Sequence, residues 1–172
     1  MQLSKRTAVA LLATSALAGS ATTAVSALGD DGPGRDHAGK GNPTVLETTV
    51  APSVPGDPAI HGASPGGAPW VLRSSEARLR RDGRLSVRLR GLVIPVAPGN
   101  GTPGPVMSVS VSLYCGVAPM AVDTSLPVPI SSRGNARIEA RLTLPAKCQV
   151  PALLIHPNGN GAVYIATSGF GG

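Results

Sequence analysis

The stretch that decides the fold spans residues 76–94 and reads EARLRRDGRLSVRLRGLVI. Apolar and polar residues alternate along it with a period of two, which is typical of a β-strand with one buried face. A three-residue loop at 81–83 pairs Leu79 with Leu85, whereas a two-residue Asp-Gly turn would place these leucines on opposite faces. We therefore predict a β-hairpin with a three-residue loop, in which Gly83 adopts the left-handed conformation that glycine tolerates.

The same register directs a set of arginines outward from the hairpin. A sheet with one face on the core needs a polar outer face, and arginine stems also cover apolar neighbours, so a solvated face explains them. Contact with a polyanion is the alternative, because Arg80 opposite Arg84 should repel, and such a cost sometimes reflects use. The candidate polyanion face comprises Arg78, Arg80, Arg84, Arg88 and Arg90, with Glu76 facing Arg88 across the hairpin.

Further segments continue the β pattern. In VMSVSVSLYC at 106–115, the apolar residues from Met107 onward share one face with Cys115, and serines share the other. ARIEARLTL at 136–144 alternates again, and the continuous apolar run PALLIHP at 151–157 fits a strand covered on both faces or near the sheet centre. The turn signal NGNG then precedes a closing strand. About seven short strands and no helical period predict an all-β fold, a small antiparallel β-sandwich.

The first 27 residues are predicted to be a secretory signal peptide. Lys5 and Arg6 precede the short apolar run TAVALLATSALA at 7–18, and VSA at 25–27 offers the small residues that a signal peptidase reads. A run of this length is too short to span a bilayer of roughly 30 Å, and no later stretch is long and apolar enough to do so. We expect a secreted, extracellular protein without a transmembrane segment after signal removal.

Composition divides the mature chain at residue 70. Residues 28–69 are dominated by Gly, Pro, Ala and Ser, and burying so few large apolar side chains would not offset an ordering entropy of about 1–2 kcal/mol per residue. We therefore predict a disordered linker at 28–69, in which only TVLETTV at 44–50 resembles a strand, and a single β-sandwich domain at 70–172. The linker has a net charge of −3 and the domain a net charge of +7.

Cys115 and Cys148 are the two cysteines of the chain. An even number of cysteines in an exported protein predicts a disulfide between them. Closing a loop of this length stabilises a fold by about 3–4 kcal/mol in the chain-entropy model. A metal or redox site is the alternative, but neither cysteine has a CxxC partner or a nearby histidine.

Candidate catalytic residues are sparse, so we predict a non-catalytic protein with no cofactor and no metal. His37 and His61 fall in the predicted linker, where a catalytic geometry cannot be held. His156 is interpreted as a partly exposed turn histidine, because no second His, Asp or Glu lies at local ligand spacing. An enzyme would have to centre its active site on His156 with Asp123. Specific nucleic-acid recognition is not expected, because stacking aromatics do not interleave with the arginines.

Residues 70–172 resemble uncharacterised secreted single-domain proteins of actinobacteria. The shared features are a Trp at the start of the domain, DGRLSVRLRGLVIP, SVSLYCG, GNARIEARLTLPAKC and YIATSGF. This resemblance implies export, an all-β domain and one disulfide, and it implies no activity. In size, sandwich architecture and aromatic-poor composition the domain also resembles small secreted chromoprotein carriers, which have two disulfides where this chain can form one.

Two functions follow from these patterns as hypotheses. The first is a non-catalytic binding module at or near the cell envelope, whose partner is an anionic cell-wall polymer met by the outward arginines. The second is a secreted carrier that holds an apolar small molecule among loops such as 98–105 and 158–161.

Overall fold

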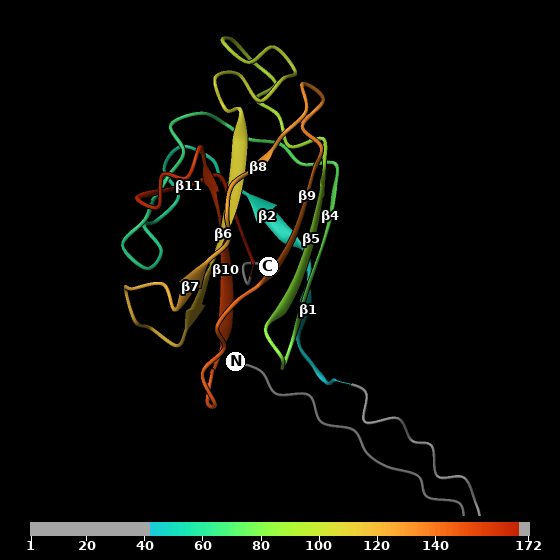
Figure 1. Ribbon diagram of the computed structural model, residues 1–172. Helices are drawn as coiled ribbons and strands as arrows, with labels where there is room; N and C mark the ends of the chain where they lie inside the picture. The colour runs from blue at the N-terminus through green and yellow to red at the C-terminus, as the bar shows by residue number, and fades with distance from the viewer. Residues whose placement is uncertain (1–41, 169–172) are drawn as a thin grey trace, which may run out of the picture. The chain divides into compact units, whose positions relative to one another are not determined.

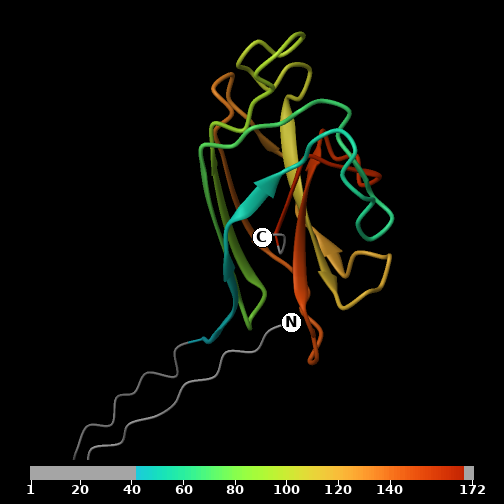
Figure 2. The same cartoon turned by 180° about the vertical axis from the view of Figure 1, so that it is seen from behind.

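The computed structural model describes residues 42–168, which fold into an all-β domain with no helix in that range. Two antiparallel sheets face each other, as Figure 1 and Figure 2 show from opposite sides. The predicted all-β antiparallel sandwich is therefore confirmed. Sheet A has the strand order β1-β4-β5-β9, with β1 at Thr44–Thr48, β4 at Ser74–Arg80, β5 at Arg84–Arg90 and β9 at Ala136–Arg141.

Sheet B forms the second layer. Its strand order is β2-β12-β10-β6-β7, with β2 at Val50–Pro52, β12 at Ala166–Ser168, β10 at Pro151–Pro157, β6 at Ser108–Cys115 and β7 at Asp123–Thr124. A short strand β8 at Val128–Pro129 also pairs with β6, while β3 at Ser64–Pro65 and β11 at Val163–Tyr164 form a separate parallel ladder. The described strands outnumber the seven expected because several of them are only two or three residues long.

The hairpin of β4 and β5 has the predicted register. Leu79 pairs with Leu85, and Glu76 pairs with Arg88. The Gly83 N–H donates to the carbonyl oxygen of Arg80 at 2.9 Å, and Gly83 has a φ of +82°, which is the left-handed conformation expected of it. The alternation of residues 76–90 therefore determines both the turn and the buried face.

The core lies between the two sheets and is built almost entirely from aliphatic side chains. The inward residues of the hairpin are no more than 1% exposed. Met107 is an exception to the predicted pattern of β6, since it precedes the strand and is 74% exposed. The main inward residues are Ala77, Leu79, Leu85, Val87 and Leu89 from sheet A, and Val109, Val111, Leu113, Leu153 and Ile155 from sheet B.

Strand β10 is covered on both faces, as its continuous apolar run predicts. It lies between β12 and β6 in the middle of sheet B. Leu153 and Ile155 face the main core, whereas Leu154 belongs to a second, smaller cluster with Tyr114 and Tyr164. Tyr164 lies in β11, and residues 60–65, which we call the covering segment, contribute the buried Ala63. A layer of chain therefore packs over the outer face of sheet B.

The folded domain begins well before residue 70, so the boundary predicted for the linker is wrong. The strands β1, β2 and β3 lie within the predicted linker range 28–69, and they pair with β4, β12 and β11, respectively. A segment with few large side chains can still be ordered when its backbone extends sheets whose core other strands supply. The predicted signal peptide at 1–27 and the linker residues 28–41 lie outside the described residues.

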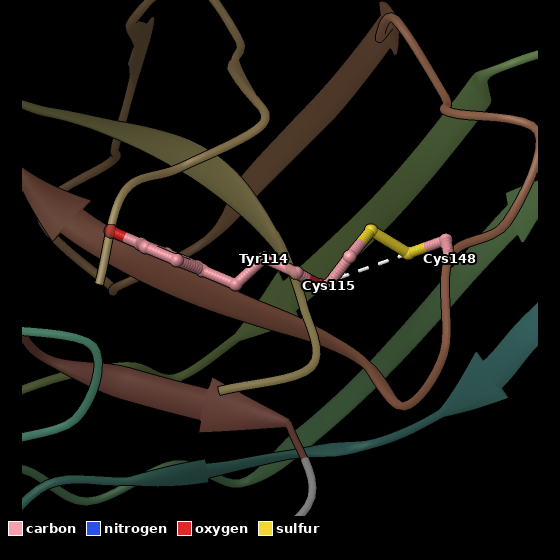
Figure 3. Close-up of a disulfide and its surroundings, with 3 residues drawn as sticks. All are labelled: Tyr114, Cys115 and Cys148. Atoms are coloured by element: carbon pink, nitrogen blue, oxygen red, sulfur yellow. Dashed lines mark hydrogen bonds between the residues drawn. A yellow bond between two sulfur atoms is a disulfide. The ribbon is translucent and has the colours of Figure 1, made fainter. Parts of the chain in front are cut away.

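The predicted disulfide between Cys115 and Cys148 is confirmed. It joins the end of β6 to the segment between β9 and β10, with a Cα–Cα distance of 5.0 Å (Figure 3). β9 belongs to sheet A and β10 to sheet B, so the bridge anchors the segment that crosses from one sheet to the other onto the end of β6.

Candidate functional site

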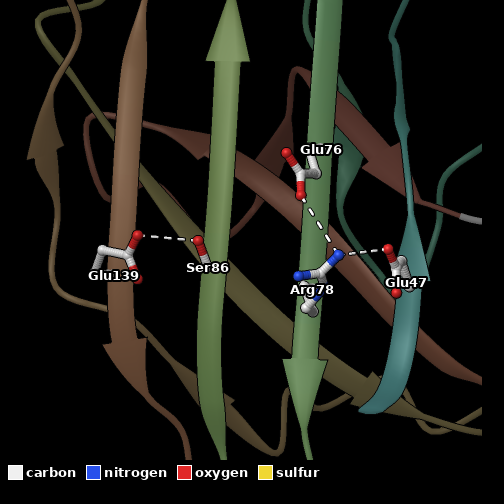
Figure 4. Close-up of polar contacts among 5 residues, drawn as sticks. All are labelled: Glu47, Glu76, Arg78, Ser86 and Glu139. Carbon is white, nitrogen blue, oxygen red and sulfur yellow. Dashed lines mark hydrogen bonds and ion pairs between the residues drawn. The ribbon is translucent and has the colours of Figure 1, made fainter.

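The outer face of sheet A carries its charged side chains in rows that run across the strands. Cross-strand pairing places Glu139 opposite Ser86, and Ser86 opposite Arg78, with Glu47 on β1 next in line. Figure 4 shows this row, in which the Ser86 hydroxyl donates to the Glu139 carboxylate at 2.9 Å. The rows on either side of it are dominated by arginine: Arg137 and Arg88 on one side, and Arg141 and Arg84 on the other.

Acidic residues pair with three of the arginines near the 81–83 turn, Arg78, Arg84 and Arg141. Arg78 Nη2 lies 2.6 Å from Glu47 Oε1 and 3.8 Å from Glu76 Oε1, and the hydrogen bond to Glu47 raises the pKa of Arg78. Asp82 is shared by two arginines, with Arg84 Nε at 3.2 Å and Arg141 Nη2 at 3.7 Å. Exposed pairs of this kind contribute at most about 1 kcal/mol each, and they offset part of the charge at this end of the sheet, where Arg80 and Arg81 form no ion pair within residues 42–168.

Asp82 also shapes the turn itself. Its Oδ1 accepts a hydrogen bond from the Arg84 N–H at 3.1 Å, and the Arg141 guanidinium donates to its backbone oxygen at 3.2 Å. Loss of surrounding water would raise the pKa of Asp82. The Arg84 N–H bond and the charges of Arg84 and Arg141 outweigh that effect, so the pKa is lowered. The carboxylate is therefore held in its charged form by the same arginines that it neutralises.

The opposite end of the face is different, because arginines gather there around an open depression of about 530 Å³. Arg88 lies directly opposite Arg137 across β5 and β9, a like-charge arrangement that destabilises a sheet. Arg137 Nε contacts Glu139 Oε1 at 2.8 Å. Within residues 42–168, Arg73, Arg88 and Arg90 have no ion pair with an acidic side chain. We call this site the arginine depression; it is lined by Arg73, Arg88, Leu89, Arg90, Pro129, Asn135, Ala136 and Arg137.

The predicted arginine set is therefore divided between two environments. Arg78 and Arg84 belong to the compensated end, and the half-buried Arg80 pairs with Thr44 of the edge strand β1. Only Arg88 and Arg90 line the arginine depression. The sequence led us to expect like-charge repulsion between Arg80 and Arg84. The pairing of β5 with β9 adds two more like-charge pairs, Arg84 opposite Arg141 and Arg88 opposite Arg137.

Sequence reasoning missed three polar residues of the depression. Arg137 stands at an outward position of an alternating stretch, so its face was predictable, but its neighbour across the sheet was not. Arg73 precedes β4, and Asn135 precedes β9 in a glycine-containing loop. The Asn135 side-chain oxygen accepts a hydrogen bond from the Gly91 N–H at 3.1 Å, which leaves its amide NH2 group as a donor. Only the long-range pairing of β5 with β9 brings these groups together.

Comparisons of this chain with family models, with curated proteins and with solved structures find no match. Among the described residues, no helix has the length and apolar character needed to cross a membrane. No group of three or more His, Cys, Asp or Glu side chains in the same part of the chain is arranged to hold a metal ion.

His156 is completely buried, so its interpretation as a partly exposed turn histidine is wrong. Its Nδ1–H donates to the Val163 carbonyl oxygen at 2.7 Å, while Nε2 is buried without a hydrogen-bond partner. The exposure was misjudged because β11 and the chain leading to it cover the outer face of β10. Asp123, the other residue of the enzyme hypothesis, accepts hydrogen bonds from the backbone N–H groups of Thr124 and Thr143, both at 2.7 Å. The Thr143 bond lowers the pKa of Asp123 and ties β7 to the chain beyond β9.

The stability of the domain is expected to depend on the protonation of His156. Burial lowers its pKa below the ordinary value of about 6.5, although the bond to Val163 acts in the opposite direction. Below pH ~6.5, His156 takes up a proton in the unfolded chain but stays neutral in the folded protein. The stability that neutral His156 allows is therefore complete above pH ~6.5, and it is lost as the pH falls toward the lowered pKa. Between pH 7.5 and 5.5, the free energy of urea unfolding should fall less for His156→Leu than for wild type. Equal losses in both proteins would contradict this expectation.

His61 is also ordered, contrary to the prediction that it lies in a disordered linker. Its ring stacks on Tyr114 with centroids 4.3 Å apart, and its Nδ1–H donates to the Ala118 carbonyl oxygen at 2.7 Å. The histidine thus fastens the covering segment to the loop between β6 and β7.

The two loops named for the carrier hypothesis meet through Asn158. Its side-chain oxygen accepts hydrogen bonds from the Met107 and Ser108 N–H groups at 2.8 and 3.1 Å, and its Nδ2 donates to Pro105 O at 3.3 Å. An apolar cavity of about 240 Å³ lies elsewhere, beside Ile60 and Tyr164. That volume is below the ~300–1,000 Å³ usual for ligand pockets, so the cavity gives the carrier hypothesis little support.

Proposed function

We propose that this protein is a non-catalytic, exported binding module that contacts an anionic polymer of the cell envelope through the arginine depression. The observation that carries the proposal is the placement of Arg88 opposite Arg137, with Arg73 and Arg90 beside them. Glu139 pairs with Arg137, but Arg73, Arg88 and Arg90 form no ion pair with an acidic side chain within residues 42–168. At the other end of the same sheet, comparable arginines are paired with Glu47 and Asp82. Repulsion among these arginines is a cost to the fold that a bound anion would reduce.

The depression suits an extended anionic chain better than an enclosed small molecule. Guanidinium groups present planar sets of donors that match phosphate and carboxylate oxygens in pairs, and Asn135 adds a neutral donor beside them. The site is open to solvent and includes outward arginines of sheet A, so a polymer could pass across it without threading. The disulfide is consistent with an extracellular protein, which supports placing the partner outside the cytoplasm.

Replacing two arginines of the depression should weaken polymer binding and its dependence on salt. We expect Arg88→Ser/Arg90→Ser to lower affinity for purified cell walls, and for a synthetic poly(glycerol phosphate), by at least about tenfold at low salt. The slope of log K against log salt should become shallower by about 2, because two fewer counterions are displaced. Co-sedimentation across a salt series measures both quantities.

The matched control is Arg80→Ser/Arg81→Ser, which removes the same charge at the 81–83 turn. This control should retain most of the affinity, because both residues lie at the opposite end of β4 and β5 from the depression. Equal weakening by the two double variants would mean that net charge alone drives binding. Unchanged binding in Arg88→Ser/Arg90→Ser would leave the arginines as a solvated face and refute the proposal.

A further inference from the structure

A second exposed feature of the domain is apolar and lies away from the arginines. The loop between β6 and β7 reads GVAPMAV at residues 116–122, and Val150 stands just before β10. Val117 is 98% exposed, Met120 79% and Val150 78%. Single apolar side chains on a surface are ordinary, whereas several on adjoining loops indicate an interaction site.

The two loops adjoin each other at the disulfide. Cys115 is bonded to Cys148 and pairs with Pro151, and the Gly116 N–H donates to the Gln149 carbonyl oxygen at 2.6 Å. In Figure 1 both loops lie in the lower part of the domain. We call this surface the apolar rim; it consists of Val117, Ala118, Pro119, Met120 and Val150.

The apolar rim is held in a defined shape. The His61 ring donates to Ala118 O and packs on Tyr114, while the Val122 N–H donates to the Leu113 carbonyl oxygen at 2.7 Å and closes the base of the loop. The disulfide fixes the neighbouring segment. A surface that is already ordered loses little conformational entropy when it binds.

Val150 provides an independent reason to connect this surface with binding. Its φ is +47°, in the left-handed region that β-branched residues rarely adopt. Glycine or asparagine would form the same turn at lower cost, yet the position holds a valine whose side chain points into solvent. Backbone strain retained at an exposed apolar side chain is a sign that the side chain is used.

We propose that the apolar rim docks on an anionic lipid surface. Lys147 is exposed in the loop that precedes β10, and residues 116–122 and 144–150 contain no acidic residue. Asp123, which follows the first loop, is engaged by the backbone N–H groups of Thr124 and Thr143, so the charge of the two loops suits anionic headgroups. A standard protein interface takes about 20–30 residues from each partner, far more than the rim offers. Loop tips with a few large apolar side chains can instead insert a short distance into the headgroup region.

The rim, carried by loops of sheet B, lies toward the 81–83 turn, whereas the arginine depression lies at the other end of the β4–β5 hairpin. The Gly83 carbonyl at the 81–83 turn accepts a hydrogen bond from Leu142, and the next residue, Thr143, bonds Asp123 directly after the loop 116–122. The depression lies at the far end of β5, beside Arg90. The two surfaces can therefore be tested separately.

The first experiment measures sedimentation of the mature protein with vesicles of phosphatidylcholine and phosphatidylglycerol. It uses about 0.5 M salt, where screening to roughly 4 Å suppresses long-range attraction to the arginines. Val117→Ser/Met120→Ser/Val150→Ser should lower the partition coefficient by at least about tenfold. Met107→Ser, which removes an equally exposed apolar side chain at the other end of β6, should leave it unchanged, as should Arg88→Ser/Arg90→Ser.

The second experiment places a fluorescent reporter in the rim. Emission of Met120→Trp should shift to the blue on vesicle addition and be quenched by brominated lipid, whereas Met107→Trp should do neither. The native Trp70 is only 4% exposed and serves as a constant background. Absence of both the shift and the quenching in Met120→Trp, or equal vesicle binding by the triple-serine variant and wild type, would overturn the lipid proposal. Either result would leave the arginine proposal standing.

Discussion

Replacing Cys115 and Cys148 by serine is expected to lower the free energy of unfolding by about 3–4 kcal/mol. The two residues are 33 positions apart, and the bridge restricts how far the unfolded chain can separate them. The effect should be large for this domain because the enclosed segment carries β7, β8 and β9, which pair with β5 and β6 in two different sheets. A typical domain has only about 5–15 kcal/mol of stability in total, so the loss would be readily detected.

Urea unfolding followed by circular dichroism measures this loss. Reduction of the wild-type disulfide provides a control that changes no side chain, and it should produce a similar destabilisation. Adding reductant to the double-serine variant should have no further effect. A loss below about 1 kcal/mol in both experiments would show that the connection between the sheets is held mainly by Asp123 and the strand pairing.

Gly83→Ala is expected to destabilise the domain by at least about 3 kcal/mol. Gly83 has a φ of +82°, and a Cβ added there would collide with the backbone carbonyl oxygen of Leu142. That oxygen belongs to the main chain, and the Leu142 N–H already donates to Gly83 O at 2.8 Å, so the two segments cannot separate without losing this bond. Backbone strain and a collision therefore add at one position.

Two other glycines separate these contributions. Gly101 has a φ of +84° with open space around it, so Gly101→Ala should cost only the backbone strain, about 1–2 kcal/mol. Gly67 has neither a positive φ nor a close neighbour, and Gly67→Ala should change stability by less than about 0.5 kcal/mol. Thermal or urea unfolding of the three variants should give this order. A Gly83→Ala protein as stable as Gly101→Ala would mean that the β4–β5 turn yields at little cost.

The parts of the fold that the sequence predicts are those determined by local alternation. The hairpin register follows from the positions of Leu79 and Leu85 around a glycine, and the buried centre of sheet B follows from the uninterrupted run at 151–157. Of the edge strands, only β1 falls in the stretch 44–50 that the sequence marked as strand-like; β2 and β3 were missed because they contribute backbone pairing more than side-chain burial. A composition rule that counts large apolar residues cannot detect such strands.

The candidate site was predictable only in part, for a related reason. Alternation shows that Arg88 and Arg90 face outward, but only the pairing of β5 with β9 places Arg137 beside Arg88. The acids that neutralise Arg78 and Arg84 come from β1 and from the turn, and Glu47 had been assigned to the linker. Which arginines retain free charge is therefore a property of the assembled sheet.

The pairing of β2 with β12 has a consequence for the timing of folding. Val50 near the start of the described chain lies opposite Ser168 near its end, and β10, which forms the middle of sheet B, is also contributed late. Sheet A and strand β6 can form earlier, but their apolar core side chains would stay exposed to solvent until residues 151–168 pair with them. Contacts this distant in sequence require a costly loop closure and slow the search for the native state. The domain therefore cannot complete its fold until almost the whole chain is available.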